Sequence, residues 1–144
     1  MKNTRHGTTN YRRLMQFIGD MAPHANNRRD HKRYSDGMHL PLVFEYLHYN
    51  DYKGRPVFSM THWGEMNGDA MRDPDITFSV DYEAKTIEPM TFQNDYLGIY
   101  QEVYIKKGET WLYSQRLRTD LDQHIYEWLN MIEQCDFQLE KKEA

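Results

Sequence analysis

The clearest pattern in this chain is a strict alternation of apolar and polar residues from 76 to 82. A period of two predicts a β-strand with one buried and one exposed face. Similar segments at residues 40–49, 55–63, 86–93 and 99–105 are separated by short turns. Short turns join antiparallel neighbours, because parallel strands need a long crossover. The pattern predicts a meander of about five antiparallel strands, and at residues 40–49 either parity can face the core.

Two amphipathic segments flank this predicted sheet. The first follows a helix cap at Thr9 or Asn10, and its apolar stripe consists of Leu14, Phe17, Ile18 and Met21. The second follows a capping box at residues 119–122, and its stripe consists of Leu117, Leu121, Ile125, Trp128, Ile132 and Cys135. The predicted fold is therefore α+β, with the sheet packed by an N-terminal helix and a long C-terminal helix.

The length of 144 residues predicts a single domain, with a helix and basic loop at 1–37 and the sheet and final helix at 38–137. Residues 24–37 lack periodicity, so they are expected to form a loop. No apolar run approaches the roughly 18 residues of a membrane helix, and no apolar stretch follows the N-terminus as in a secretory signal. The single cysteine, Cys135, cannot form an internal disulfide. A cytoplasmic protein is expected.

Charge is unevenly distributed along the chain. Residues 1–35 hold eight Lys and Arg against two Asp, a net +6, whereas residues 36–144 hold ten against twenty Asp and Glu, a net −10. The basic segment can pair with the acidic body of its own fold, or it can contact nucleic acid or an acidic protein. The candidate nucleic-acid contacts are Arg12, Arg13, Arg28, Arg29, Lys32 and Arg33.

Residues 62–75 place many functional side chains in one expected loop between two strands. Trp63 and Met66 can act as apolar anchors within a charged rim. The candidate binding residues are His62, Trp63, Glu65, Met66, Asp69, Arg72 and Asp75. A structural interpretation is also open, because Asn67-Gly68 and Asp73-Pro74 are typical turn sequences and Arg72 can pair with Asp69 or Asp75.

An alternative is a metal-dependent hydrolase or nuclease that uses His62, Glu65, Asp69 and Asp75. Their spacing matches no standard metal signature. Cys135 lies on an apolar helix stripe and is expected to be a structural thiol, His124 is expected on the helix surface, and His24, His31 and His39 have no ligand-like spacing. No complete catalytic or nucleotide-binding motif occurs. We therefore expect no catalytic residue and no cofactor.

Three segments carry a resemblance to a known family. They are N-G-D-A-M-R-D-P-D-I-T-F at 67–78, N-D-Y-L-G-I-Y-Q-E-V-Y at 94–104 and W-L-N-M-I-E-Q at 128–134. Over residues 38–137 the chain resembles an uncharacterised domain family carried by plasmids, conjugative elements and phages of Firmicutes and Bacteroidetes. The resemblance implies an accessory protein of a mobile element, and it implies no activity.

The expected function is a non-enzymatic protein-binding module in the cytoplasm of a bacterial host. The acidic, tyrosine-rich body favours a basic partner, such as a nucleic-acid-binding defence complex of the CRISPR-Cas type. An anti-defence inhibitor would act in this way. The hydrolase and the nucleic-acid-binding protein remain the alternatives.

Overall fold

The computed structural model describes residues 2–24 and 29–141, which form two helices and nine strands. The elements are α1 (Gly7–Ile18), β1 (His31–Ser35), β2 (Leu42–Asn50), β3 (Pro56–Met66), β4 (Asp69–Asp81), β5 (Thr86–Asn94), β6 (Ile99–Glu102), β7 (Tyr104–Lys107), β8 (Thr110–Tyr113), α2 (Gln115–Gln134) and β9 (Gln138–Leu139).

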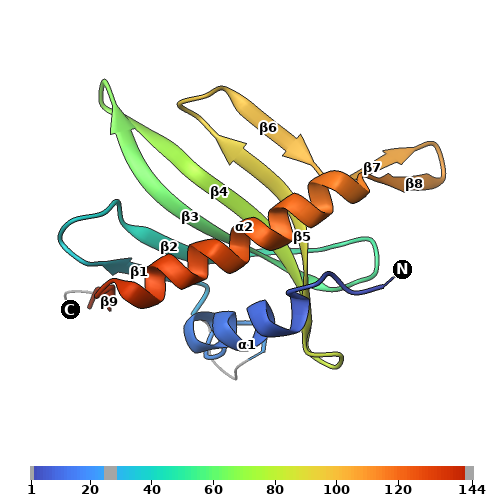
Figure 1. Ribbon diagram of the computed structural model, residues 1–144, viewed down its shortest axis with the longest axis horizontal. Helices are drawn as coiled ribbons and strands as arrows, with labels where there is room; N and C mark the ends of the chain where they lie inside the picture. Colours follow the sequence, from blue (N-terminus) through green and yellow to red (C-terminus); the bar gives the residue numbers. More distant parts are fainter. Residues whose placement is uncertain (1, 25–28, 142–144) are drawn as a thin grey trace.

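Seven of the strands form one antiparallel sheet in the order β6-β5-β4-β3-β2-β1-β9. Strands β1 to β6 are therefore a meander, and β9 adds to its outer edge beside β1. Strands β7 and β8 form a separate hairpin that projects away from the sheet (Figure 1). The predicted α+β class, antiparallel sheet and two helices are confirmed, but the sheet has two strands more than expected.

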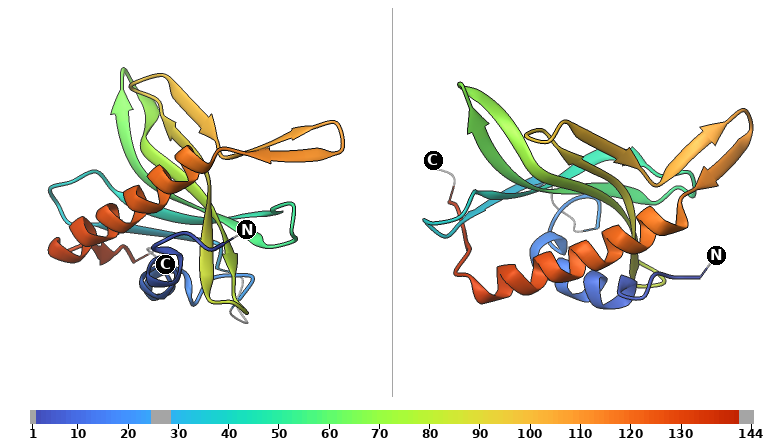
Figure 2. Two further views of the ribbon diagram at one scale, coloured as in Figure 1. Left: turned by 45° about the vertical axis from the view of Figure 1, so that its right-hand side comes forward. Right: turned by 45° about the horizontal axis from the view of Figure 1, so that its top comes forward.

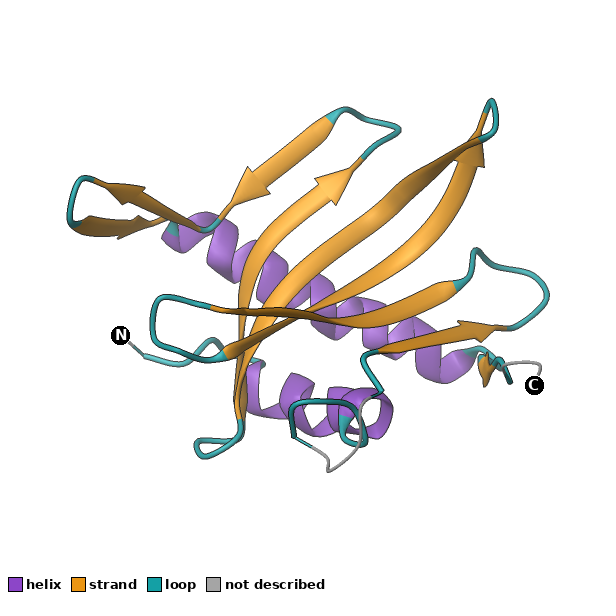
Figure 3. Ribbon diagram, turned by 180° about the vertical axis from the view of Figure 1, so that it is seen from behind, coloured by secondary structure: helices purple, strands orange, loops and turns teal. Residues whose placement is uncertain are grey.

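Both helices cover the same face of the sheet, with α2 lying diagonally across the strands (Figures 1 and 2). The face seen in Figure 3 carries no helix. The core between the layers contains Phe44, Phe58, Phe78 and Ile125, all fully buried. On β2 the even positions face this core, which settles the parity that the sequence left open. The three phenylalanines of this core lie on the neighbouring strands β2, β3 and β4. Each stands at a position that faces the helices, as expected for a sheet with one buried face.

The expected loop at residues 24–37 is wrong in its second half, because His31–Ser35 is strand β1. Lys32 and Tyr34 are buried there, and β1 pairs with both β2 and β9. The expected strand at 99–105 is also corrected, since it divides into β6 and β7. These short strands carry no periodic signal, so pairing with a neighbour decides them.

Both helices begin before their predicted caps. α1 starts at Gly7 rather than after Thr9 or Asn10. α2 starts at Gln115, and the Ser114 side chain accepts a hydrogen bond from the Leu117 backbone at 3.2 Å. Ser114 therefore satisfies a free amide of the first turn, as N-cap residues do. Within the described ranges, neither helix is long and apolar enough to cross a membrane.

The expected loop at 62–75 is instead a long hairpin. β3 runs to Met66 and β4 begins at Asp69, so Asn67 and Gly68 alone form the turn. Both have positive φ, 53° and 85°, as a type I′ turn requires. The turn expected at Asp73-Pro74 is wrong, because both residues lie within β4 next to a register shift. The extended pairing places the candidate residues on opposite faces of one sheet.

Candidate functional site

The helix-free face of the sheet presents two rows of side chains that cross it from β1 to β6. Residues directly opposite in antiparallel strands share a face, so the register defines each row. One row consists of His31, Glu45, Ser59, Thr77, Thr91 and Glu102. The other consists of Arg33, Val43, Thr61, Asp75, Gln93 and Tyr100. We call this surface the open face.

A pocket of about 260 Å³ lies in the open face over the middle strands. Two carboxylates, those of Glu45 and Asp75, contribute to its lining. Three aromatic side chains, Tyr49, Trp63 and Tyr100, also line it. Tyr49 and Tyr100 are more than half exposed, so their rings are available from solvent. The pocket thus combines negative charge with accessible aromatic surface.

Asp75 is the most buried charged group of this pocket, with 9% of its surface exposed. Its Oδ1 accepts a hydrogen bond from the Thr61 hydroxyl at 2.8 Å, and its Oδ2 lies 4.0 Å from Arg72 Nε. Burial raises the pKa of Asp75, and these two contacts oppose the increase. The charge of Glu45 raises it further. An added cation would stabilise the ionised form of Asp75.

The tyrosines of the pocket are held as neutral hydroxyl groups. The Tyr100 hydroxyl donates a 2.9 Å hydrogen bond to Glu102 Oε1. Burial, this hydrogen bond and the charge of Glu102 raise the pKa of Tyr100 to about 12. Burial and the nearby charge of Asp75 also raise the pKa of Tyr49. Neither phenol is therefore placed to act as a base.

Arg72 joins the pocket to its aromatic wall. The guanidinium carbon lies 5.2 Å from the centre of the Trp63 ring, which is a cation–π distance. Arg72 also donates its backbone N–H to Asp95 Oδ2 at 2.8 Å, and its Nη1 lies 3.5 Å from the same oxygen. These contacts fix Trp63 and Arg72 next to Asp75.

A second pocket of about 570 Å³ shares Trp63 with the first. It extends from Arg33 and Val43 to Gly64 and Glu65 near the hairpin tip. Trp63 therefore stands between an acidic pocket and a wider, more open hollow. Together they form one continuous surface across the sheet.

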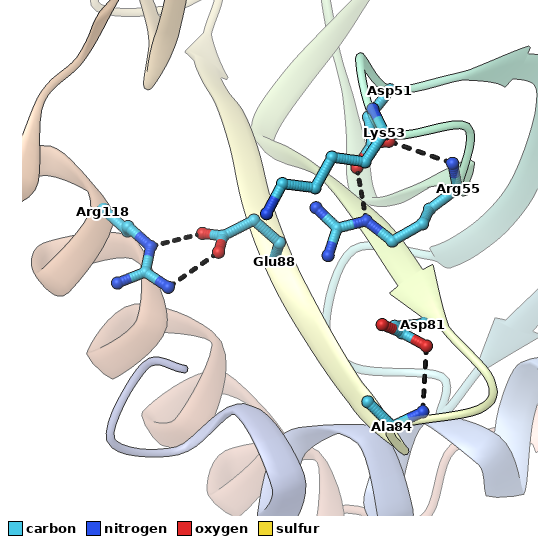
Figure 4. Close-up of polar contacts among 7 residues, drawn as sticks. All are labelled: Asp51, Lys53, Arg55, Asp81, Ala84, Glu88 and Arg118. Carbon is cyan, nitrogen blue, oxygen red and sulfur yellow. Dashed lines mark hydrogen bonds and ion pairs between the residues drawn. The ribbon is translucent and has the colours of Figure 1, made fainter. Parts of the chain in front are cut away.

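A buried ion pair lies where the open face meets the start of α2. Glu88 is directly opposite Ser79 on the neighbouring strand. Arg118 donates two hydrogen bonds to its carboxylate, at 2.6 and 2.8 Å (Figure 4). In the same view Lys53 extends from the β2–β3 turn toward Glu88. The bidentate pair ties α2 to β5 and closes this end of the face.

The structure separates the residues predicted from the 62–75 segment. Trp63, Arg72 and Asp75 meet at the pocket. His62 instead faces α2, where Trp128 Nε1 donates to its Nε2 at 2.8 Å. The remaining three candidates, Glu65, Met66 and Asp69, are exposed at the hairpin tip. The convergence required for a metal site of His62, Glu65 and Asp69 is therefore absent, because alternate strand positions point to opposite faces.

The basic N-terminal residues are largely engaged within the fold. Arg13 Nε lies 2.8 Å from Glu133 Oε1, and Lys32 Nζ lies 2.8 Å from Asp20 Oδ1. Arg33 Nε lies 3.1 Å from Glu140 Oε2. Of the other candidates, Arg12 is exposed and Arg29 interacts with another group of the protein. Arg28 lies outside the described residues. Two of the six candidates, Arg13 and Arg33, thus pair with the acidic body, and Lys32 pairs with an aspartate of its own segment.

One group of potential metal ligands was not foreseen from the sequence. Within residues 2–24 and 29–141, donor atoms of Asp36, His39 and Cys135 come within 4.8 Å of one another. Cys135, expected to be buried, is half-buried. His124 is also half-buried, against Phe92 and Trp128, and burial lowers its pKa.

A family model for a domain of unknown function, DUF6908, matches residues 9–138. The chain belongs to the DUF6908 family. The matched range includes most of α1 and the whole of β1. No curated protein and no solved structure matches this DUF6908 chain.

Sequence reasoning missed Glu45, Tyr49, Gln93 and Tyr100 as members of this site. Each lies on a predicted strand at the parity that faces away from the core. The available signal was the polar and aromatic character of those outward positions. Only the strand register shows that they share one pocket with Asp75.

Proposed function

We propose that this DUF6908 protein is a non-enzymatic binding module whose open face engages a basic segment of another protein. The observation that carries the proposal is the 9%-exposed Asp75 carboxylate in a pocket shared with Glu45 and three aromatic rings. Burying a carboxylate is costly unless it is paired with a cation. Arg72 Nε lies 4.0 Å from Asp75 Oδ2, and the same side chain also pairs with Asp95, so a lysine or arginine of a partner would supply a closer cation.

The acidic pocket, taken by itself, has the size for a single inserted side chain. Pockets for small molecules are typically about 300–1,000 Å³, and this pocket is about 260 Å³. An arginine or lysine inserted beside Asp75 would also contact the faces of Tyr49 and Tyr100. Such cation–π contacts contribute about 0.5–2 kcal/mol each.

The surrounding surface fits a protein partner. Trp63 lines both hollows of the open face. Tryptophan, tyrosine and arginine are enriched among residues that dominate binding energy, particularly near the centre of an interface. Trp63, Tyr100 and Arg72 supply these three types. The wider hollow of about 570 Å³ would accept apolar residues that flank the basic one.

The class of partner follows from charge. Residues 36–144 carry a net −10, and complementary charge speeds encounter with a basic surface. Nucleic-acid-binding proteins present such surfaces. We propose that the partner is one of these in a bacterial cytoplasm, a defence complex of the CRISPR-Cas type included. The resemblance to plasmid and phage proteins motivates this choice.

The test compares open-face variants with matched variants elsewhere. Partners are captured from nuclease-treated bacterial lysate, and the affinity of each purified partner is then measured directly. Trp63→Ala and Glu45→Gln are expected to weaken binding at least tenfold. Trp111→Ala and Glu109→Gln, on the β7–β8 hairpin, are expected to leave the affinity unchanged because both residues lie outside the open face.

Two results would contradict the proposal. One is the recovery of no protein partner after nuclease treatment. The other is a partner whose affinity is the same for wild type, Trp63→Ala and Glu45→Gln. A basic partner should also bind more weakly as salt increases, since surface charges are screened.

A further inference from the structure

A cluster of donor atoms outside the open face lies where the end of α2 meets the segment after β1. Asp36, His39 and Cys135 each offer one donor atom, and the three atoms lie within 4.8 Å of one another. We propose that these residues form a binding site for a thiophilic divalent metal ion, Zn²⁺ in particular. This site is separate from the proposed protein-binding face.

The fold brings together residues that are far apart in the sequence. Cys135 caps the C-terminus of α2, and β9 begins three residues later at Gln138. β9 pairs with β1, with Gln138 opposite Ser35. Asp36 comes directly after Ser35, so this pairing places the Asp36–His39 turn beside the end of α2. The site therefore exists only when the last strand is docked.

Asp36 is held firmly in the required position. Its Oδ1 accepts the backbone N–H groups of Met38 and His39 at 2.9 and 2.8 Å. Its Oδ2 lies 2.6 Å from Nδ1 of His39. Only 5% of the Asp36 side chain is exposed, although it lies in a surface turn. The side chains of Asp36 and His39 are thus preorganised, so metal binding would cost little further conformational entropy at these two residues.

The donor types match zinc chemistry. Thiolate, imidazole and carboxylate are the three protein ligands that Zn²⁺ uses. One thiolate and one carboxylate neutralise the double charge of the ion, while His39 binds as the neutral ring. On binding, the Cys135 thiol releases its proton to solvent, so affinity should increase with pH.

The distances require only a small closure. Zinc–ligand bonds of about 2.0–2.3 Å in a tetrahedron separate the ligand atoms by about 3.3–3.8 Å. Asp36 Oδ2 and His39 Nδ1 would move apart from 2.6 Å as the ion replaces the proton between them, and the neutral ring would then carry its proton on Nε2. Cys135 would move inward by up to about 1.3 Å. The His39 side chain is 45% exposed, so a water molecule can occupy the fourth position.

The experiment titrates metal-free protein with Zn²⁺ and, separately, with Co²⁺ as a spectroscopic probe. Wild type is expected to bind one equivalent of metal and to show thiolate-to-cobalt charge-transfer absorption. Cys135→Ser should abolish that absorption, while His39→Ala and Asp36→Asn should weaken affinity at least tenfold. Zn²⁺ should increase the melting temperature of wild type but not of these variants.

The chain supplies a matched control in His48 and Asp30. His48 Nε2 lies 2.8 Å from Asp30 Oδ2, and both side chains are at least half exposed. Cys135 is the single cysteine of the chain and belongs to the other cluster. His48→Ala should therefore leave metal affinity unchanged. Circular dichroism of every variant checks that each one is folded.

Three outcomes would overturn the proposal. The first is that metal-free wild type binds less than about a tenth of an equivalent of Zn²⁺ at micromolar concentration. The second is stoichiometric cobalt binding without charge-transfer absorption, which places the metal away from Cys135 and needs no variant. The third is unchanged affinity in folded Cys135→Ser. None of these outcomes affects the proposal that the open face binds a protein, because that proposal is tested by the affinity for protein partners.

Discussion

The indole nitrogen of Trp128 donates a 2.8 Å hydrogen bond to Nε2 of His62, which links α2 to β3 beneath the sheet. Since Nε2 accepts, the proton of the neutral ring is on Nδ1, which donates to the Leu40 carbonyl at 3.0 Å. Both ring nitrogens are engaged and the side chain is buried. His62 is therefore a neutral structural residue and not a metal ligand.

This arrangement predicts a loss of stability in mild acid. Burial lowers the pKa of His62 below its usual 6.5, and it lowers that of His124 in the same direction. The unfolded chain then binds protons more readily than the folded one, so the free energy of unfolding falls as pH drops below about 6.5. It levels off below the folded-state pKa values. Urea unfolding between about pH 8 and pH 5 measures this dependence.

The control for that prediction is His62→Gln, which keeps a side chain able to accept from Trp128. Its unfolding free energy should depend less on pH than that of wild type, with the remaining dependence due in part to His124. The same pH dependence in both proteins would show that His62 does not titrate in this way.

Replacing Asp75 with asparagine should stabilise the protein and abolish partner binding. Burial raises the folded-state pKa of Asp75, so the stability that this group contributes is present in acid and is lost as pH increases through that pKa. Asp75→Asn removes the charge and keeps an oxygen for Thr61. The free energy of unfolding at neutral pH should increase by about 1 kcal/mol, because a buried charge kept for binding is replaced by a neutral amide.

Denaturant unfolding and partner affinity are measured on the same samples of this variant. Asp120→Asn, at an exposed position of α2, serves as the control and should change neither quantity. Reduced stability of Asp75→Asn would indicate that the carboxylate is part of the folding core and not a binding group.

Breaking the buried pair of Arg118 and Glu88 should be strongly destabilising. Glu88 is 7% exposed and Arg118 is 4% exposed. Arg118→Met leaves the Glu88 charge buried without its bidentate partner, which costs about 3–5 kcal/mol. Urea unfolding of the single variant and of Arg118→Met with Glu88→Leu tests this, because the double variant should recover most of the loss. A single-variant loss below about 1 kcal/mol would contradict it.

Substitutions of the neighbouring residues Arg12 and Arg13 distinguish a role in folding from a role in nucleic-acid binding. Arg13 is 7% exposed and donates hydrogen bonds to Glu133 and Asn130 at 2.8 Å, whereas Arg12 is exposed. Arg13→Gln should destabilise the protein by about 1–3 kcal/mol, and Arg12→Gln by less than about 0.5 kcal/mol. Neither should change the affinity for labelled DNA in a fluorescence anisotropy titration. A salt-sensitive tenfold decrease with Arg12→Gln would favour the nucleic-acid alternative instead.

Much of the fold could be predicted because its signals are local. Alternation at residues 76–81 and the apolar stripe from Leu117 to Ile132 each lie within one element, so periodicity alone identifies them. The Asn67-Gly68 turn was recognisable for the same reason, since both residues tolerate positive φ. The two residues of β9 carry no such pattern, and they form a strand because β1 offers an unpaired edge.

The candidate site could be predicted only in part. The crowding of polar and aromatic residues in one segment indicates Trp63, Arg72 and Asp75, but it equally indicates His62, which faces α2 instead. A strand alternates its side chains between two faces, so proximity in sequence does not imply a shared site. Glu45 and Tyr100 reach the pocket from other strands through the register.

The sequence by itself determined the α+β class, the two amphipathic helices and most strands of the meander, because these depend on the spacing of apolar residues along the chain. Only the tertiary structure decided which face of the sheet stays open, which of its residues surround Asp75, and that Asp36 and His39 meet Cys135. These relationships join residues through strand pairing and helix docking. They depend on contacts between distant segments, for which the periodicity of any one segment carries no information.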